Sequence, residues 1–237
     1  MVRIGVRVPL RELKRLLVEI PENFSLDVLL EPKDYSLESI PHTLEQLDEI
    51  AEMGTEVVSL SIENWRRHDP SICENVIFLA ESMDVEYIVF KLRDPVEAPP
   101  PLLDFLVGSS VKLSLVPPRT ADIIDFKKFL SRLEYRQFVT IAYDIFERYT
   151  GQTKDLVEEI SNISGLLSIV YLAGMDKARR RICLSSKGII DVWEVISNLV
   201  ALREDVLLVL NYGIDRASLM RDYNMIKQIY TSIVEKL

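Results

Sequence analysis

Eight short apolar runs recur along the chain and restrict its fold more than any other feature of the sequence. They are rich in valine, isoleucine and leucine, and each has the length of a buried strand. The runs lie at 2–8, 26–30, 57–62, 87–92, 111–116, 138–143, 167–172 and 206–210. Near-continuous apolar strands of this kind are typical of parallel sheets that are covered on both faces. The sequence therefore predicts a parallel sheet.

The segments between these runs have the spacing of amphipathic helices. One carries Leu44, Leu47 and Ile50 on one face with charged residues opposite, and it has Pro41 in its first turn and Gly54 at its end. Strict alternation of strands and helices implies right-handed crossovers, and eight units are the number that closes a barrel. We predict one domain, 1–237, with the (β/α)₈ TIM-barrel fold of the α/β class. An open, doubly wound sheet is the alternative.

Composition narrows the functional classes. The 237 residues carry a formal charge of −9, which opposes binding to nucleic acid or to an anionic membrane. The longest apolar runs fall far short of the roughly 20 residues of a membrane helix, and the start lacks signal-peptide features, so we expect a cytoplasmic protein. Abundant Glu, Lys and Arg with eight glycines suit a thermophilic source. The pattern of apolar residues does not decide whether the chain forms a homo-oligomer.

Polar residues that follow the predicted strands are the candidate site. In an (β/α)₈ barrel the functional groups sit at the carboxyl ends of the strands. We expect acid–base residues at Asp144, Glu147, Lys91 and Glu63. We expect substrate-binding residues at Arg181, Lys187, Tyr171, Asn211, Arg119 and Glu31.

Asp144 and Glu147 are three residues apart just past a strand and place two carboxylates near one point. With Glu31 or Glu63 they could hold one hard divalent ion, Mg²⁺ or Mn²⁺. The alternative is that no ion is bound, that Asp144 caps the next helix and that Glu147 is solvated. Lys91 is a candidate base, Schiff-base nucleophile or anion clamp, with a salt bridge to a neighbouring carboxylate as the alternative.

The basic run 177–181 stands out in an acidic chain. Together with Lys187 in the segment 185–188, it could bind the phosphate of a small-molecule substrate such as a phosphorylated sugar, because the loops after strands seven and eight often do so in barrels. A solvated surface loop or a contact between subunits is the alternative.

Four segments carry a resemblance to a known family: 141–147 with Gly151, 168–176, 188–191 and 208–211. They resemble the xylose isomerase-like barrel superfamily, which includes sugar-phosphate isomerases, epimerases and endonuclease IV-type enzymes. In that family these segments typically read Asp-x-x-His, a strand from His to Asp, Gly-x-Ile-Asp, and a strand ending in Glu. The resemblance implies a TIM barrel with a metal site at its mouth.

The chain departs from the family pattern at most of the implied metal ligands. Asp144 is retained, but Glu147, Tyr171 and Asn211 stand where the family has His, His and Glu, and Lys91 falls about where endonuclease IV-like members have a His. A lysine there repels a divalent ion. Three functions therefore compete: a sugar-phosphate isomerase or epimerase-like enzyme, a degenerate barrel that binds a metabolite or protein, and a metal-dependent phosphodiesterase.

Overall fold

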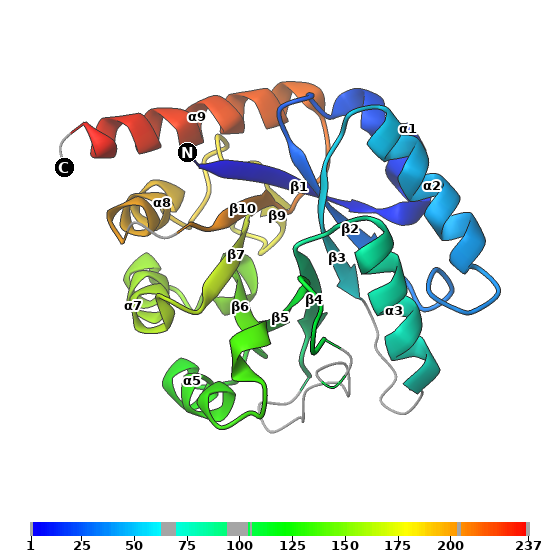
Figure 1. Ribbon diagram of the computed structural model, residues 1–237. Helices are drawn as coiled ribbons and strands as arrows, with labels where there is room; N and C mark the ends of the chain where they lie inside the picture. The colour runs from blue at the N-terminus through cyan, green and yellow to red at the C-terminus, as the bar shows by residue number, and fades with distance from the viewer. Residues whose placement is uncertain (1, 63–69, 94–103, 105, 203–204, 236–237) are drawn as a thin grey trace.

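Eight parallel strands close into a barrel in the computed structural model, which describes residues 2–62, 70–93, 104, 106–202 and 205–235. The order around the barrel is β1-β10-β7-β6-β5-β4-β3-β2, so β10 pairs with β1 and closes the sheet (Figure 1). The strands are β1 (Arg3–Pro9), β2 (Ser25–Leu30), β3 (Val57–Ile62), β4 (Tyr87–Lys91), β5 (Lys112–Val116), β6 (Val139–Asp144), β7 (Leu167–Leu172) and β10 (Leu207–Leu210). The predicted barrel is confirmed, and the open sheet is excluded.

Helices surround the barrel on its outer side (Figure 1). They pack their apolar stripes on the sheet; α2, for example, buries Leu47 and Ile50. It ends at Glu52, and the predicted Gly54 follows the C-cap residue Met53 with a φ of 78° that glycine readily adopts. The α-helices are α1 (Leu13–Leu16), α2 (Ile40–Glu52), α3 (Pro70–Ser82), α5 (Ile123–Ser131), α6 (Ile145–Arg148), α7 (Thr153–Ile163), α8 (Val192–Ala201) and α9 (Arg216–Val234). Short 3₁₀ turns lie at Leu10–Glu12, Leu17–Glu19 and Arg136–Phe138. No helix among the described residues is long and apolar enough to cross a membrane.

The barrel interior has an apolar layer beneath a polar one. Successive side chains of a strand point to opposite faces of the sheet, so one residue in two points inward. The apolar layer is a separate buried cluster that includes Val58, Val89, Ala142, Ile169 and Tyr171. It forms a floor, and the polar side chains at the carboxyl ends of the strands lie above it.

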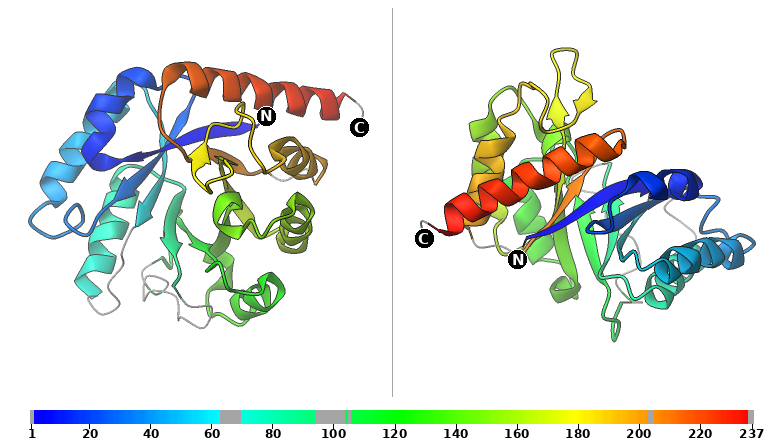
Figure 2. Two further views of the ribbon diagram at one scale, coloured as in Figure 1. Left: turned by 180° about the vertical axis from the view of Figure 1, so that it is seen from behind. Right: turned by 90° about the horizontal axis from the view of Figure 1, so that it is seen from above.

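A small antiparallel hairpin, β8 (Gly174–Met175) with β9 (Arg181–Ile182), interrupts the alternation after β7. It projects from one end of the barrel, as the right-hand view of Figure 2 shows in yellow. Gly174 permits the close pairing, because a Cβ atom there would lie 3.0 Å from the Cys183 carbonyl oxygen. The Asp176 carboxylate accepts hydrogen bonds from the amides of Ala178 and Arg180 and closes the turn. The hairpin therefore has a defined geometry.

Candidate functional site

A cavity of about 640 Å³ opens where the strands end. Residues on β1 to β7 line it, and Asn211 lines it directly after β10. The lining side chains are those of Arg7, Leu29, Ser61, Ile62, Val89, Lys91, Leu92, Arg93, Val116, Pro118, Arg119, Thr120, Asp144, Glu147, Tyr171, Arg181 and Asn211. The cavity lies where the barrel fold places ligand sites, and its size suits a small molecule.

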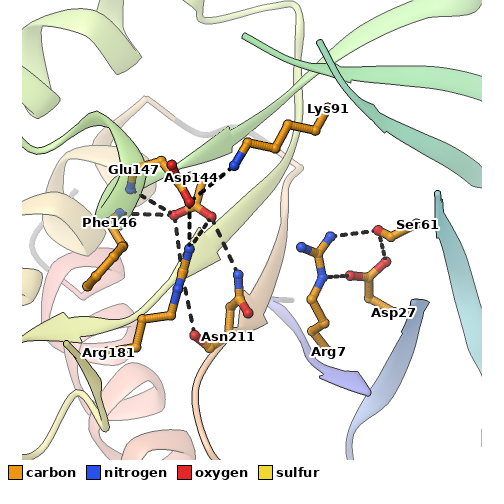
Figure 3. Close-up of polar contacts among 9 residues, drawn as sticks. All are labelled: Arg7, Asp27, Ser61, Lys91, Asp144, Phe146, Glu147, Arg181 and Asn211. Carbon is orange, nitrogen blue, oxygen red and sulfur yellow. Dashed lines mark hydrogen bonds and ion pairs between the residues drawn. The ribbon is translucent and has the colours of Figure 1, made fainter. Parts of the chain in front are cut away.

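Asp144 is the carboxylate of the cavity lining that accepts the most hydrogen bonds. It ends β6, is 5 % exposed and caps α6 by accepting hydrogen bonds from the amides of Phe146 (3.0 Å) and Glu147 (3.2 Å). The capping role that the sequence offered as an alternative is therefore present. The same carboxylate also faces the cavity, where Arg181 and Asn211 donate to it (Figure 3).

Arg181 joins the two carboxylates of the mouth. Its Nη2 lies 2.9 Å from Oδ2 of Asp144 and 3.4 Å from Oε1 of Glu147, and its guanidinium stacks 4.3 Å from the centre of the Phe146 ring. Lys91 approaches Glu147 from β4, with its Nζ 3.1 Å from the same Oε1. Figure 3 shows the four charged side chains converging from β4, β6, α6 and the hairpin. We call Lys91, Asp144, Glu147 and Arg181 the mouth cluster.

A second ion pair lies deeper, between β1 and β2. The Arg7 Nε donates to the Asp27 carboxylate at 2.6 Å, and its Nη2 donates to the Ser61 hydroxyl at 2.6 Å. Asp27 also accepts from the hydroxyls of Ser59 and Ser61, both at 2.7 Å, and is fully buried. The Arg7 guanidinium lies 3.9 Å from the centre of the Tyr171 ring. We call Arg7, Asp27, Ser59, Ser61 and Tyr171 the buried cluster.

Tyr171 belongs to this buried cluster rather than to the mouth cluster. It is fully buried, and its hydroxyl lies 3.1 Å from the Ser61 hydroxyl. Burial raises the pKa of Tyr171 far above its usual value, so the phenol stays protonated at neutral pH. Its ring forms part of the cavity floor.

Arg148 holds one wall of the cavity although its side chain does not line it. Its Nη1 donates to the carbonyl oxygens of Pro118 (2.9 Å), Arg119 (3.1 Å) and Ala121 (2.8 Å), and the guanidinium pairs with Glu159. These bonds fix the loop after β5 and so position Arg119, one of the residues expected to bind substrate, in the lining of the cavity. Sequence reasoning missed Arg148, because three carbonyl groups of a distant loop leave no local pattern.

Other predicted site residues lie elsewhere. Glu31 pairs with Arg11 at 2.7 Å and is not part of the cavity lining. Lys187 is exposed and also lies outside that lining. In the same loop, the amides of Leu184 and Ser185 already donate to the Asp222 carboxylate, at 2.6 and 2.8 Å. Glu63 lies outside the described residues.

The described residues do not fit the divalent ion that the family resemblance implies. They contain no group of three or more His, Cys, Asp or Glu side chains placed to hold a metal. Arg181 stands between the two carboxylates, Tyr171 is a protonated phenol, and Asn211 turns its amide nitrogen, 3.4 Å away, toward Asp144. Arg181, Tyr171 and Asn211 each present a hydrogen-bond donor, whereas a metal ion requires an atom with a free lone pair.

The cavity is positively charged within an acidic chain. Among the described residues, its lining includes five cationic side chains, Arg7, Lys91, Arg93, Arg119 and Arg181, and two carboxylates, Asp144 and Glu147. The whole chain has a formal charge of −9. Arg7 is compensated by Asp27 below it, and Lys91, Arg119 and Arg181 still outnumber Asp144 and Glu147. A cleft lined by one sign of charge concentrates ligands of the opposite sign, so the cavity suits an anion.

Comparison with known proteins finds similarity at the level of structure. No protein-family model matches the chain, and no curated protein matches its sequence. A D-tagatose 3-epimerase-like protein superposes with a TM-score of 0.70 at 14 % identity, covering 99 % of each chain. A xylose isomerase domain protein from Planctomyces limnophilus superposes with a TM-score of 0.71 at 10 % identity, again covering 99 % of each chain.

A 3-hexulose-6-phosphate synthase from Salmonella typhimurium is more distant, with a TM-score of 0.54 at 10 % identity over 98 % of this chain and 100 % of that one. At such identities the similarity establishes the fold. The chain is a TIM barrel, as predicted, and its fold is similar to those of the D-tagatose 3-epimerase-like protein and the xylose isomerase domain protein.

Proposed function

We propose that the chain is an isomerase or epimerase-like enzyme that moves a proton next to the carbonyl of a small, anionic, polyhydroxylated compound such as a sugar phosphate. The observation that carries this proposal is the pairing of Glu147 with Lys91 at 3.1 Å on the wall of the cavity. A carboxylate can take the proton, and an ammonium group beside it can stabilise the negative oxygen that results.

Glu147 is the better candidate base of the two mouth carboxylates. Its side chain is 33 % exposed, whereas that of Asp144 is 7 % exposed and accepts hydrogen bonds from two amides, Arg181 and Asn211. A carboxylate that accepts this many hydrogen bonds is held in one orientation. We therefore assign Asp144 to positioning Arg181, and Glu147 to proton transfer.

The proposed reaction needs no group other than these side chains. Glu147 removes a proton from the carbon beside the carbonyl, and the electron pair moves to the carbonyl oxygen to give an enediolate. Lys91 and Arg181 face that oxygen as cations. The protonated Glu147 then returns the proton to the neighbouring carbon from the same face, while the hydroxyl proton of that carbon passes to the former carbonyl oxygen, and the product is the isomeric carbonyl compound.

The positive cavity supports an anionic substrate. Arg119 lines its rim beyond the mouth cluster and is exposed. Arginine binds phosphate and carboxylate groups with its planar fork of donors. A phosphate ester held there leaves the rest of the molecule within the cavity beside Glu147.

Exchange of carbon-bound hydrogen in D₂O tests the proposal without knowledge of the product. Ketoses, aldoses and their phosphate esters are incubated with the protein, and the proton signal beside the carbonyl is followed by NMR. We expect exchange in at least one phosphate ester, and a loss of roughly 10²-fold or more in Glu147→Gln, the usual contribution of general acid–base catalysis. Glu158→Gln, exposed on α7, is the matched control and keeps the wild-type rate.

Equal exchange rates in wild type and Glu147→Gln would contradict the role of Glu147. Absence of exchange in every compound, with binding of one of them, would favour a second function, a metabolite-binding barrel. The pairing of both mouth carboxylates with cations favours that alternative, because each carboxylate is already compensated before any ligand arrives.

A further inference from the structure

We propose that Arg181 occupies the cation position between Asp144 and Glu147, so that the protein excludes divalent ions from its mouth and would admit one if this side chain were removed. The proposal concerns binding alone. It is therefore tested separately from the catalytic activity proposed above.

The geometry places one guanidinium against both carboxylates. Nη2 of Arg181 lies 2.9 Å from an Asp144 oxygen and 3.4 Å from a Glu147 oxygen, and Nη1 lies 3.4 Å from the other Asp144 oxygen. A single positive group that contacts two carboxylates fills the space in which an ion would contact both. Nη1 also lies 3.4 Å from the Asn211 carbonyl oxygen, so a backbone oxygen that faces the same position is engaged as well.

Charge balance also opposes an added ion. Two carboxylates already face two cations, Arg181 and Lys91. A divalent ion beside them would lie within a few ångströms of both positive groups, and partial burial strengthens such repulsion. Mg²⁺ and Mn²⁺ also prefer a full set of oxygen ligands, whereas the donors aimed at Asp144 are N–H groups.

The hairpin holds Arg181 in this position. Arg181 is the first residue of β9 and pairs with Met175 of β8, whose end is closed by the Asp176 turn. Stacking on Phe146 places the guanidinium from a second side. The side chain is 24 % exposed, so its removal would open the position to solvent rather than leave a dry cavity.

The test is titration of MnCl₂ by calorimetry, with melting temperature as a second readout, on four proteins. These are wild type, Arg181→Ala, Arg181→Ala with Asp144→Asn, and Lys177→Ala. Lys177→Ala removes one positive charge from the same hairpin turn and is the matched control. Any ion that binds the folded state selectively must raise the melting temperature.

We expect no saturable Mn²⁺ binding by wild type or Lys177→Ala, and no change in their melting temperatures with Mn²⁺ or EDTA. We expect Arg181→Ala to bind one equivalent at least tenfold more tightly than wild type, and the added Asp144→Asn to abolish this. Saturable binding of one equivalent of Mn²⁺ by wild type would overturn the proposal. Absence of binding by both wild type and Arg181→Ala would also overturn it, because the side chain would then not stand in an ion's position.

If Arg181→Ala does not fold, Arg181→Gln keeps most of the side chain and removes its charge, and it replaces alanine with the same expected results. The wild-type titration needs no variant, and one tight equivalent of Mn²⁺ there would by itself contradict the proposal.

Discussion

The two arginine–carboxylate clusters of the barrel end contain similar groups in different surroundings. Arg7 and Asp27 lie on adjacent strands, and the Asp27 side chain has no exposed surface. Arg181 reaches the mouth from a hairpin, and its partners Asp144 and Glu147 have side chains 7 % and 33 % exposed. Figure 3 shows the two clusters side by side, with separate sets of contacts.

This difference in burial assigns different roles to the clusters. Every contact of the Asp27 carboxylate is made to Arg7, Ser59 or Ser61 inside the barrel, and a ligand has no access to it. The mouth cluster has solvent on one side, and Lys91 in it is 57 % exposed. We therefore expect that disrupting the buried cluster lowers the free energy of unfolding. Disrupting the mouth cluster should instead change ligand binding.

The largest expected effect is that of Asp27→Ala. It removes a fully buried carboxylate and leaves the Arg7 guanidinium, whose side chain is 19 % exposed, and the hydroxyls of Ser59 and Ser61 without their partner. Breaking a buried pair in this way costs about 3–5 kcal/mol. Equilibrium unfolding in urea measures the loss. A cost below about 1 kcal/mol would show that the pair stabilises the fold no more than an exposed ion pair does, and the distinction between the clusters would then fail.

Arg181→Ala is expected to cost less, about 1 kcal/mol, because its partners keep other donors and its own side chain is partly exposed. The same urea titration measures it. Ligand binding sharpens the comparison. Arg181→Ala should reduce the free energy of ligand binding by more than it reduces the free energy of unfolding. A loss of stability as large as that of Asp27→Ala would show that both clusters serve mainly to stabilise the fold.

The smallest expected effect is a local pH dependence of the hairpin. The amide of Arg180 and the other donors around Asp176 hold the pKa of that carboxyl below its usual value. A lowered folded-state pKa means that the stabilisation is present above the unfolded-state pKa, about 3.9, and is lost as pH falls through the folded-state value. The hairpin should therefore remain intact at neutral pH and loosen in strong acid.

NMR titration of the Arg180 amide shift should follow this transition, and Asp176→Asn should abolish it. A hairpin whose signals are the same from neutral pH to strong acid in the wild type would contradict the role of Asp176.

The strands were predictable from the sequence because strands of a parallel barrel are buried on both faces. Their apolar runs are therefore nearly continuous, and all eight predicted ranges lie within one residue of the observed strands at each end. Val57–Ile62 and Leu167–Leu172 agree at both ends. The cap at Asp144 was equally visible, since it depends on residues two and three positions later. Local rules therefore account for most of the architecture.

The contacts of the site were less accessible because they join distant parts of the chain. Arg181 contacts Asp144 across 37 positions, through a hairpin that the alternation of strands and helices does not predict. Asp27 sits within an apolar run, and no local pattern of the sequence indicates that it pairs with Arg7 on the neighbouring strand. Lys187 and Glu31 were predicted from loop order alone, which does not determine which side chains turn into the cavity.

The most direct test of this account is the NMR signal of the Nε–H groups of Arg7 and Arg181, followed with and without inorganic phosphate. We predict that the Arg7 signal is protected from solvent exchange by its buried bond to Asp27 and does not shift with phosphate. The Arg181 signal should exchange rapidly and should shift as phosphate binds the positive mouth. Equal protection of both groups, or a phosphate response at Arg7 and none at Arg181, would contradict the division of the barrel end into a structural pair and a ligand-binding pair.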